Sequence, residues 1–215
     1  MNRRTKTRLT ANIVIAVLVA VAWIQMILGN EELLASGGLS SLKYFTTLSN
    51  VFEGISCIIW IILNVNFAKS EKGNRLKNFT DALKYAASVC VALTFLTVII
   101  FLGPMFGYDN MFTHANLWFH LVIPLLSMAE FVFFNQSEVR IRENFAAVVP
   151  MLLYGTVYLV NILLNGVSEF PNTNDLYGFA TWGIPIGVVI FAALCGITYG
   201  IGLALRLLNK RLQIK

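Results

Sequence analysis

The alternation of apolar and polar stretches divides the chain into six long apolar segments joined by short polar connections. Each segment has about 20 residues, the length that an α-helix needs to cross the hydrocarbon core of a bilayer. The pattern therefore predicts an all-α integral membrane protein, a six-helix transmembrane bundle in which residues 1–215 form a single transmembrane domain. The helices are expected at about 11–29, 43–66, 81–102, 116–135, 145–165 and 179–208.

Two local features bear on the ends of these helices. The apolar run 12–28 follows a basic start, as in a signal peptide, but it is longer than the apolar core of a typical signal peptide. We therefore expect an uncleaved first helix. Gly103-Pro104 is expected to end the third helix, because both residues disfavour its continuation.

Composition supports the membrane class. Of the 215 residues, 57% are hydrophobic and only 13% are charged, and the mean hydropathy is +0.72. A soluble domain would carry roughly twice this charged fraction. The connections leave no room for a separate soluble domain.

The net charge of +5 is explained by where the basic residues lie. They gather at both ends of the chain and in alternate connections, which is the positive-inside pattern of a protein with both termini in the cytoplasm. This placement argues against nucleic acid and for membrane lipid as the partner; in a bacterium the location would be the plasma membrane. Only Lys43 lies in one of the other connections. The basic groups are Arg3, Arg4, Lys6 and Arg8; Lys69, Lys72, Arg75, Lys77 and Lys84; Arg140 and Arg142; and Arg206, Lys210, Arg211 and Lys215.

The second expected helix carries a polar stripe although its composition is apolar. Residues three, four and seven apart share one face of a helix. Polar groups and carboxyl groups are costly in hydrocarbon unless they have partners, so this stripe is expected to face protein or trapped water. Its members are Thr46, Ser49, Asn50, Glu53, Ser56 and Cys57.

Two further helices carry polar faces that are expected to meet this stripe near the outer leaflet. In the fourth helix, His120 lies one turn before Pro124, which removes a backbone hydrogen bond and is expected to bend the helix. Thr46 and His120 are both expected about 5–8 Å inside the outer boundary, at ~1.5 Å per residue. The remaining polar positions on the two helices are Asn116, Ser127 and Glu130, and Tyr154, Tyr158, Asn161 and Asn165.

An alcohol and an imidazole at one depth suit ester hydrolysis. His120 would take the proton of Thr46 as the hydroxyl attacks an ester carbonyl, and would then protonate the leaving alkoxide. Donors to the oxyanion would come from Asn50, Asn116 or Asn161, with Ser49 assisting and Tyr158 lining the pocket. The group that orients the imidazole would be Glu53 or an asparagine.

Other interpretations stay open. His120 is also compatible with a structural hydrogen bond to a neighbouring helix, and either Thr46 or Thr47 with a back-bond to its own helix. Glu53 and Glu130 are compatible with buried protonated donors that join helices. Together with His120 they would instead form the relay of a proton-coupled or small-molecule transporter. A third reading is a non-catalytic binding or assembly subunit.

The sequence indicates neither a metal nor a cofactor. The two histidines are six residues apart, on different helix faces, and no cysteine or carboxylate completes a ligand set. The three cysteines lie in apolar spans and are expected to be small core residues. Oligomeric state and substrate identity are not encoded in any motif.

The segment Lys43-Tyr44-Phe45-Thr46 and the His120–Pro124 pair resemble the androgen-induced protein family, which includes the androgen-dependent TFPI-regulating proteins and similar small bacterial membrane proteins. Animal members are six-helix membrane hydrolases that cleave fatty acid esters of hydroxy fatty acids with a threonine nucleophile. The resemblance implies Thr46 as nucleophile, His120 as its base and a small lipid-like substrate. The proline follows His120 by four residues rather than the animal members' five.

Overall fold

The six-helix expectation is confirmed. The computed structural model describes residues 3–28, 38–66, 71–168 and 173–213, and within these ranges it contains helices and no strand. Six of its helical spans are long and apolar enough to cross a membrane. Of the predicted basic positions, Lys69 and Lys215 lie outside the described residues.

The spans differ from the expected ranges mainly at their ends. The first helix begins at Arg3 rather than near residue 11, and the last begins at Ile184, just before Pro185, rather than at 179. Arginine and lysine are good helix formers, and their long side chains allow a helix to continue beyond the apolar region. The long helices are α1 Arg3–Leu28, α2 Phe45–Asn66, α3 Glu71–Thr97, α7 Ile123–Phe134, α9 Val149–Asn165 and α10 Ile184–Gln213.

Short helical pieces complete the chain. A 3₁₀ turn, η1 (Gly38–Lys43), leads into α2, and α8 (Ile141–Ala146) precedes α9. The connection between the third and fourth spans is built from α4 Gly103–Phe106, α5 Tyr108–Met111 and α6 His114–Leu117, and it is flanked by the π-helical turns η2 Val98–Leu102 and η3 Trp118–Val122.

The third span does not end at Gly103-Pro104, as the sequence had suggested. It continues through η2 into α4, where the Gly103 N–H bonds to the carbonyl of Val98, five residues back. The fourth span repeats this arrangement: the Ile123 N–H bonds to the Trp118 carbonyl, and Pro124 follows. A proline ring clashes with the carbonyl four residues before it, and the wider π turn accommodates that clash.

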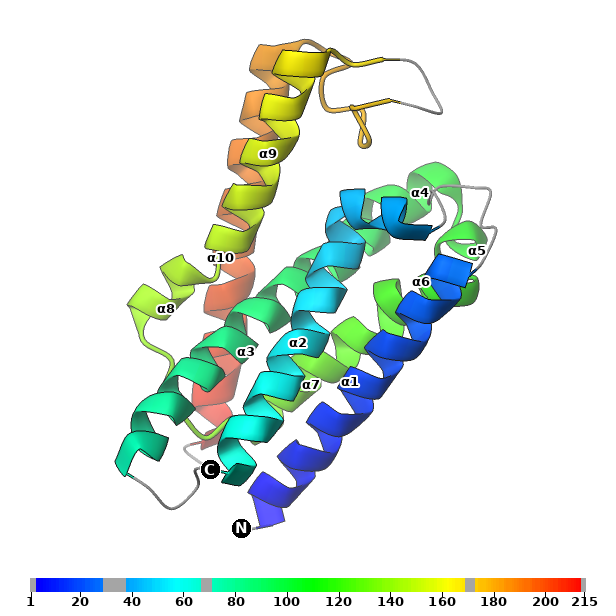
Figure 1. Cartoon of the computed structure of the whole chain (residues 1–215). Helices are drawn as coiled ribbons and strands as arrows, with labels where there is room; N and C mark the ends of the chain where they lie inside the picture. The colour runs from blue at the N-terminus through cyan, green and yellow to red at the C-terminus, as the bar shows by residue number, and fades with distance from the viewer. Residues whose placement is uncertain (1–2, 29–37, 67–70, 169–172, 214–215) are drawn as a thin grey trace.

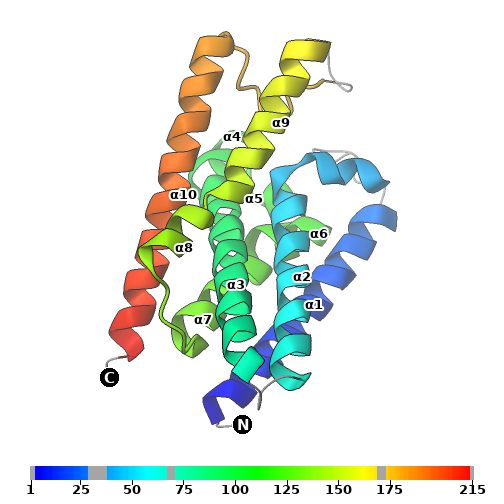
Figure 2. The ribbon, with the colours of Figure 1, turned by 60° about the vertical axis from the view of Figure 1, so that its left-hand side comes forward.

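The helices α1, α2, α3 and α7 form a four-helix bundle, and successive spans alternate in direction (Figure 1). On one side of this bundle α10 packs against α3 and α7, and α9 packs against α10. Both termini lie at one end of the molecule, and the α9–α10 pair extends beyond the other helices at the opposite end (Figures 1 and 2). We call that opposite end the far end.

Two apolar clusters hold these layers together. One joins α3, α7 and α10 around Tyr85 and Phe131, and the other joins α1, α2 and η3 around Phe119 and Cys57. Between α9 and α10, the Gly155 backbone lies so close to the Phe191 ring that an added Cβ would come within 2.0 Å of it. This contact sets the separation of the two helices.

We expect Gly155→Ala to destabilise the protein by about 1–3 kcal/mol, because the new methyl group must displace Phe191 or separate the helices. The matched control is Gly196→Ala on α10, where nothing lies within 4 Å of the added Cβ. That change should be neutral or stabilise the helix by up to about 1 kcal/mol. Thermal unfolding in one detergent measures both variants, and equal midpoints would contradict the close contact.

Candidate functional site

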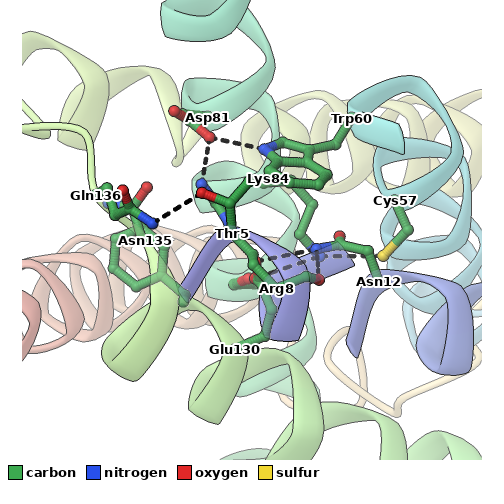
Figure 3. Close-up of polar contacts among 12 residues, drawn as sticks. Thr5, Arg8, Asn12, Cys57, Trp60, Asp81, Lys84, Glu130, Asn135 and Gln136 are labelled. Carbon is green, nitrogen blue, oxygen red and sulfur yellow. Dashed lines mark hydrogen bonds and ion pairs between the residues drawn. The ribbon is translucent and has the colours of Figure 1, made fainter. Parts of the chain in front are cut away.

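The centre of the four-helix bundle contains five charged side chains that alternate in sign. In order they are Asp81, Arg8, Glu130, Lys84 and Glu53, and we call them the ionic chain. Arg8 Nη1 lies 2.7 Å from Asp81 Oδ1, and Arg8 Nε lies 2.6 Å from Glu130 Oε1. Lys84 Nζ lies 3.7 Å from Glu130 Oε2 and pairs directly with Glu53. Figure 3 shows Arg8, Lys84 and Glu130 at its centre.

The ionic chain is removed from solvent, since each of its members is at most 2% exposed. Neutral donors bond to the carboxylates at its two ends. Asp81 accepts hydrogen bonds from the Trp60 indole, at 2.8 Å, and from the Ser137 hydroxyl (Figure 3 for Trp60). Glu53 accepts one from the Ser127 hydroxyl at 2.7 Å. Such bonds offset part of the cost of burying charge, whereas Arg8 Nη2 and Glu130 Oε2 have no hydrogen-bond partner among the described residues.

Three members of the ionic chain were missed by sequence reasoning. Arg8 and Lys84 were grouped with the basic residues that set topology, and Asp81 was taken as the start of a helix; the structure buries all three. They lie at the edges of apolar runs, where a charge usually marks a helix end. The available signal was the pair Asp81 and Lys84, which share a helix face at the start of a long uncharged span.

The polar stripe of α2 continues from the ionic chain to the far end. Ser49 bonds to Thr94 of α3 at 3.0 Å, and Asn50 donates to the Phe119 carbonyl of η3 at 3.1 Å. Thr47 points elsewhere, because its hydroxyl donates to the Met26 sulfur of α1. Thr46 lies in line with Asn50, one turn away, and is half-buried whereas the rest of the stripe is buried. Thr46 is therefore the member of the stripe that is accessible from outside the bundle.

His120 is held in the π turn η3, and its ring is 6% exposed. Its Nδ1 lies 2.7 Å from the carbonyl oxygen of Met111. A carbonyl only accepts, so Nδ1 carries the proton and Nε2 of the neutral ring is the acceptor. Among the described residues, no hydrogen bond occupies Nε2. The orienting group is thus a backbone carbonyl in the far-end connection, not Glu53 or an asparagine.

The helices α2 and α7 run in the same direction, and one hydrogen bond sets their register (Figure 1). Glu53, which accepts the bond, follows Thr46 by seven residues, and Ser127, which donates it, follows His120 by seven. The Asn50–Phe119 bond gives an offset five residues smaller, so the two bonds together place Thr46 between the levels of residues 115 and 120, within about one and a half turns of His120. Within the described part of the chain no hydrogen bond joins their side chains.

The other predicted site residues are distributed differently. Both N–H groups of the Asn50 side chain are used, by the Thr46 and Phe119 carbonyls, so Asn50 has no donor left for an oxyanion. Asn116 is half-buried at α6, one turn before His120. Tyr158 and Asn161 instead bond to Asp175 and Asn174 of the connection that follows α9.

An aromatic cluster joins the α9–α10 pair to the start of α2. The Tyr177 hydroxyl accepts the Phe45 N–H at 2.8 Å, and the Tyr154 hydroxyl donates to the Lys43 carbonyl at 2.8 Å. Burial raises the pKa of Tyr177 to about 12, which keeps the phenol neutral. Phe45, the residue before Thr46, therefore connects the four-helix bundle to the α9–α10 pair.

The described residues contain no group of three or more His, Cys, Asp or Glu side chains placed to hold a metal ion. The carboxylates of the ionic chain are instead engaged by Arg8 and Lys84. The chemistry that the site offers is that of a hydroxyl, a neutral imidazole and amide groups.

We expect Lys84→Met to destabilise the protein by about 3–5 kcal/mol, because it leaves the buried Glu53 carboxylate without its cation, whereas Glu130 keeps Arg8. The double variant Glu53→Gln/Lys84→Met should recover part of this loss, since that carboxylate is then removed. Lys210→Met, at an exposed lysine of α10, is the matched control. Thermal unfolding distinguishes these variants, and a double variant no more stable than Lys84→Met would contradict the Glu53–Lys84 pair.

Pro124 and Asn50 should be coupled energetically. Because proline has no N–H, the Phe119 carbonyl lacks a π-type backbone donor, and Asn50 supplies one. Asn50→Ala should therefore cost about 1–3 kcal/mol in wild-type protein. In a Pro124→Ala background it should cost less, since the restored N–H can bond to that carbonyl. A double-mutant cycle of unfolding free energies measures the coupling, and additive effects would contradict it.

Comparison of the chain with protein-family models, curated proteins and solved structures finds no match.

Proposed function

We propose that this protein is an intramembrane hydrolase of lipid esters, with Thr46 as nucleophile and His120 as general base. The observation that carries the proposal is the placement of His120. Its Nδ1–H is fixed by the Met111 carbonyl, its Nε2 is left as the acceptor, and the span that carries it is bonded to the helix of Thr46 through Asn50 and Glu53. The resemblance to the androgen-induced protein family supports the same two residues.

The proposed reaction has two steps. The Thr46 hydroxyl attacks the ester carbonyl while His120 Nε2 takes its proton, and the resulting imidazolium then gives that proton to the leaving alkoxide. An acyl-threonine and a free alcohol result. Water then attacks the acyl group, again losing a proton to Nε2, and releases the carboxylic acid and threonine. In both steps the Met111 carbonyl stabilises the imidazolium through Nδ1–H.

The reaction requires a hydrogen bond from the Thr46 hydroxyl to His120 Nε2, which is not formed among the described residues. Catalytic hydrogen bonds often form only when substrate is bound. Because Asn50 has no free donor, we assign the oxyanion contact to Asn116, which lies one helical turn before His120 on the half-buried side of α6.

The position of the site suits a lipid substrate. Thr46 is at the far end of the stripe, where the polar groups cease to be fully buried, and the ionic chain lies deeper in the bundle. With both termini in the cytoplasm, the far end would face the outer leaflet of the membrane, the plasma membrane in a bacterium. A lipid would then reach the site from that leaflet.

A proton-coupled transporter is the second candidate, because Glu53 and Glu130 share Lys84 at the centre of the bundle. Such a relay would use the ionic chain to carry protons between the two ends of the molecule. It predicts proton uptake by proteoliposomes that depends on Lys84, without ester hydrolysis. The geometry of His120 favours the hydrolase.

The test of the hydrolase is turnover of 4-nitrophenyl palmitate by purified protein in detergent micelles. Thr46→Ala and His120→Ala should each lower the rate by about 10²- to 10⁴-fold, the usual contribution of a nucleophile–base pair. The matched controls are Thr47→Ala, on the face toward α1, and His114→Ala, which is exposed. Both should stay near the wild-type rate. Equal rates in all five proteins, or no hydrolysis by any, would rule out the proposal.

A further inference from the structure

The structure contains an apolar groove between α9 and α10 at the far end. Its empty volume is about 450 Å³, counting the space open to the outside. The groove runs along most of α9 and the outer part of α10. It is lined by side chains of α9, α10 and the connection between them, among them Tyr154, Tyr158, Leu159, Phe179, Phe191 and Leu194.

The groove presents carbon and no hydrogen-bonding group, although two tyrosines line it. The Tyr154 hydroxyl is turned to the Lys43 carbonyl and the Tyr158 hydroxyl to Asp175, so that only their rings face the groove. Because Gly187 has no side chain, the protein backbone at Phe179 can lie close to α10; an added Cβ would be 3.1 Å from the Phe179 carbonyl oxygen. A surface of this kind suits a hydrocarbon chain and offers nothing to a polar ligand.

Aromatic side chains link the groove to the start of α2. The Tyr154 ring, which forms one wall, packs against Phe45 with a centroid distance of 5.2 Å, and Phe45 immediately precedes Thr46. The Tyr177 hydroxyl bonds to the Phe45 N–H, and the Tyr177 ring stacks on Phe179 at 5.3 Å. The Tyr154 wall therefore separates the groove from Phe45 by one layer of side chains, and an acyl chain in the groove would lie on the other side of this wall from the start of α2.

We propose that this groove binds the acyl chain of the substrate, so that the enzyme prefers esters of long, unbranched fatty acids. The inference rests on the proposed function. It adds a binding site for the acyl chain on α9 and α10, separate from the α2–η3 site of chemistry. Each methylene buried in the groove would stabilise the bound ester, so the preference should grow with chain length until the groove is full.

The first experiment fills the groove with Leu159→Trp and compares butyrate and palmitate esters of 4-nitrophenol. The ratio of kcat/KM for palmitate over butyrate should fall by about tenfold or more, equivalent to the burial of about two methylene groups, while the butyrate value stays within about twofold. Val157→Trp, on the exposed face of α9, is the matched control and should leave the ratio unchanged. An unchanged ratio in Leu159→Trp would overturn the proposal.

A second experiment tests the groove independently of hydrolysis. Protein in nanodiscs is irradiated with a diazirine-bearing palmitate ester or with a diazirine-bearing phospholipid, and the labelled peptides are identified by mass spectrometry. The ester should label residues 151–162 and 184–194 in wild-type protein and less in Leu159→Trp. Absence of labelling there, or equal labelling by the phospholipid, would show that the groove is no substrate site. If the ester labels the groove but is not hydrolysed, the proposed function fails and the binding site stands.

Discussion

The bundle depends on one constraint: a charge within hydrocarbon needs a partner of opposite charge and donors or acceptors for its other atoms. The ionic chain gives each charge an opposite partner by drawing residues from four helices to one place, although Arg8 Nη2 and Glu130 Oε2 have no hydrogen-bond partner among the described residues. Arg8 of α1 joins Asp81 of α3 to Glu130 of α7, and Lys84 of α3 joins Glu130 to Glu53 of α2. Since apolar side chains pack almost equally well against lipid, these directional contacts specify which helices are neighbours and in what register.

A second constraint acts at the far end, where two prolines interrupt the helices that enter and leave the same connection. One residue separates each proline from the π turn before it, and the turn before Pro124 contains His120. The missing N–H of Pro124 is compensated by the Asn50 side chain, which thereby joins α2 to η3 beside the imidazole. The same feature that breaks the regular helix also attaches it to the polar stripe.

Much of the fold could be predicted from the sequence, because membrane spans are encoded by length and hydropathy. The six spans and the polar face of α2 follow from periodicity alone, and Thr46 and His120 were expected at one level from their distances to the helix ends. Arg8 and Lys84 could not be recognised as buried, since a basic residue at the edge of a span normally reaches water. Their burial depends on partners from distant segments, which no local pattern reveals.

The candidate site was predicted by residue type but not by contact. Glu53 was considered as the group that orients His120, yet the structure pairs it with Lys84, and the Met111 carbonyl takes that role. A backbone carbonyl has no sequence signature, and its position depends on the π turn and the short helices before it. Likewise Asn50 was a candidate donor to an oxyanion, whereas one of its N–H groups bonds to the Phe119 carbonyl, which Pro124 leaves without a backbone donor, and the other bonds to the Thr46 carbonyl.

The two constraints act together on the proposed chemistry. The ionic chain places Glu53 against Ser127, and this bond sets the level of α2 relative to α7. The Asn50–Phe119 bond then holds the next turn of α2 against η3. The helix of Thr46 and the span of His120 are thus joined by two hydrogen bonds. The aromatic cluster attaches the α9–α10 pair to the start of α2, through Phe45. The proposed nucleophile thus lies between a polar interior and the aromatic cluster that borders an apolar groove. This arrangement would suit a lipid ester, with its carbonyl beside polar groups and its chain in hydrocarbon.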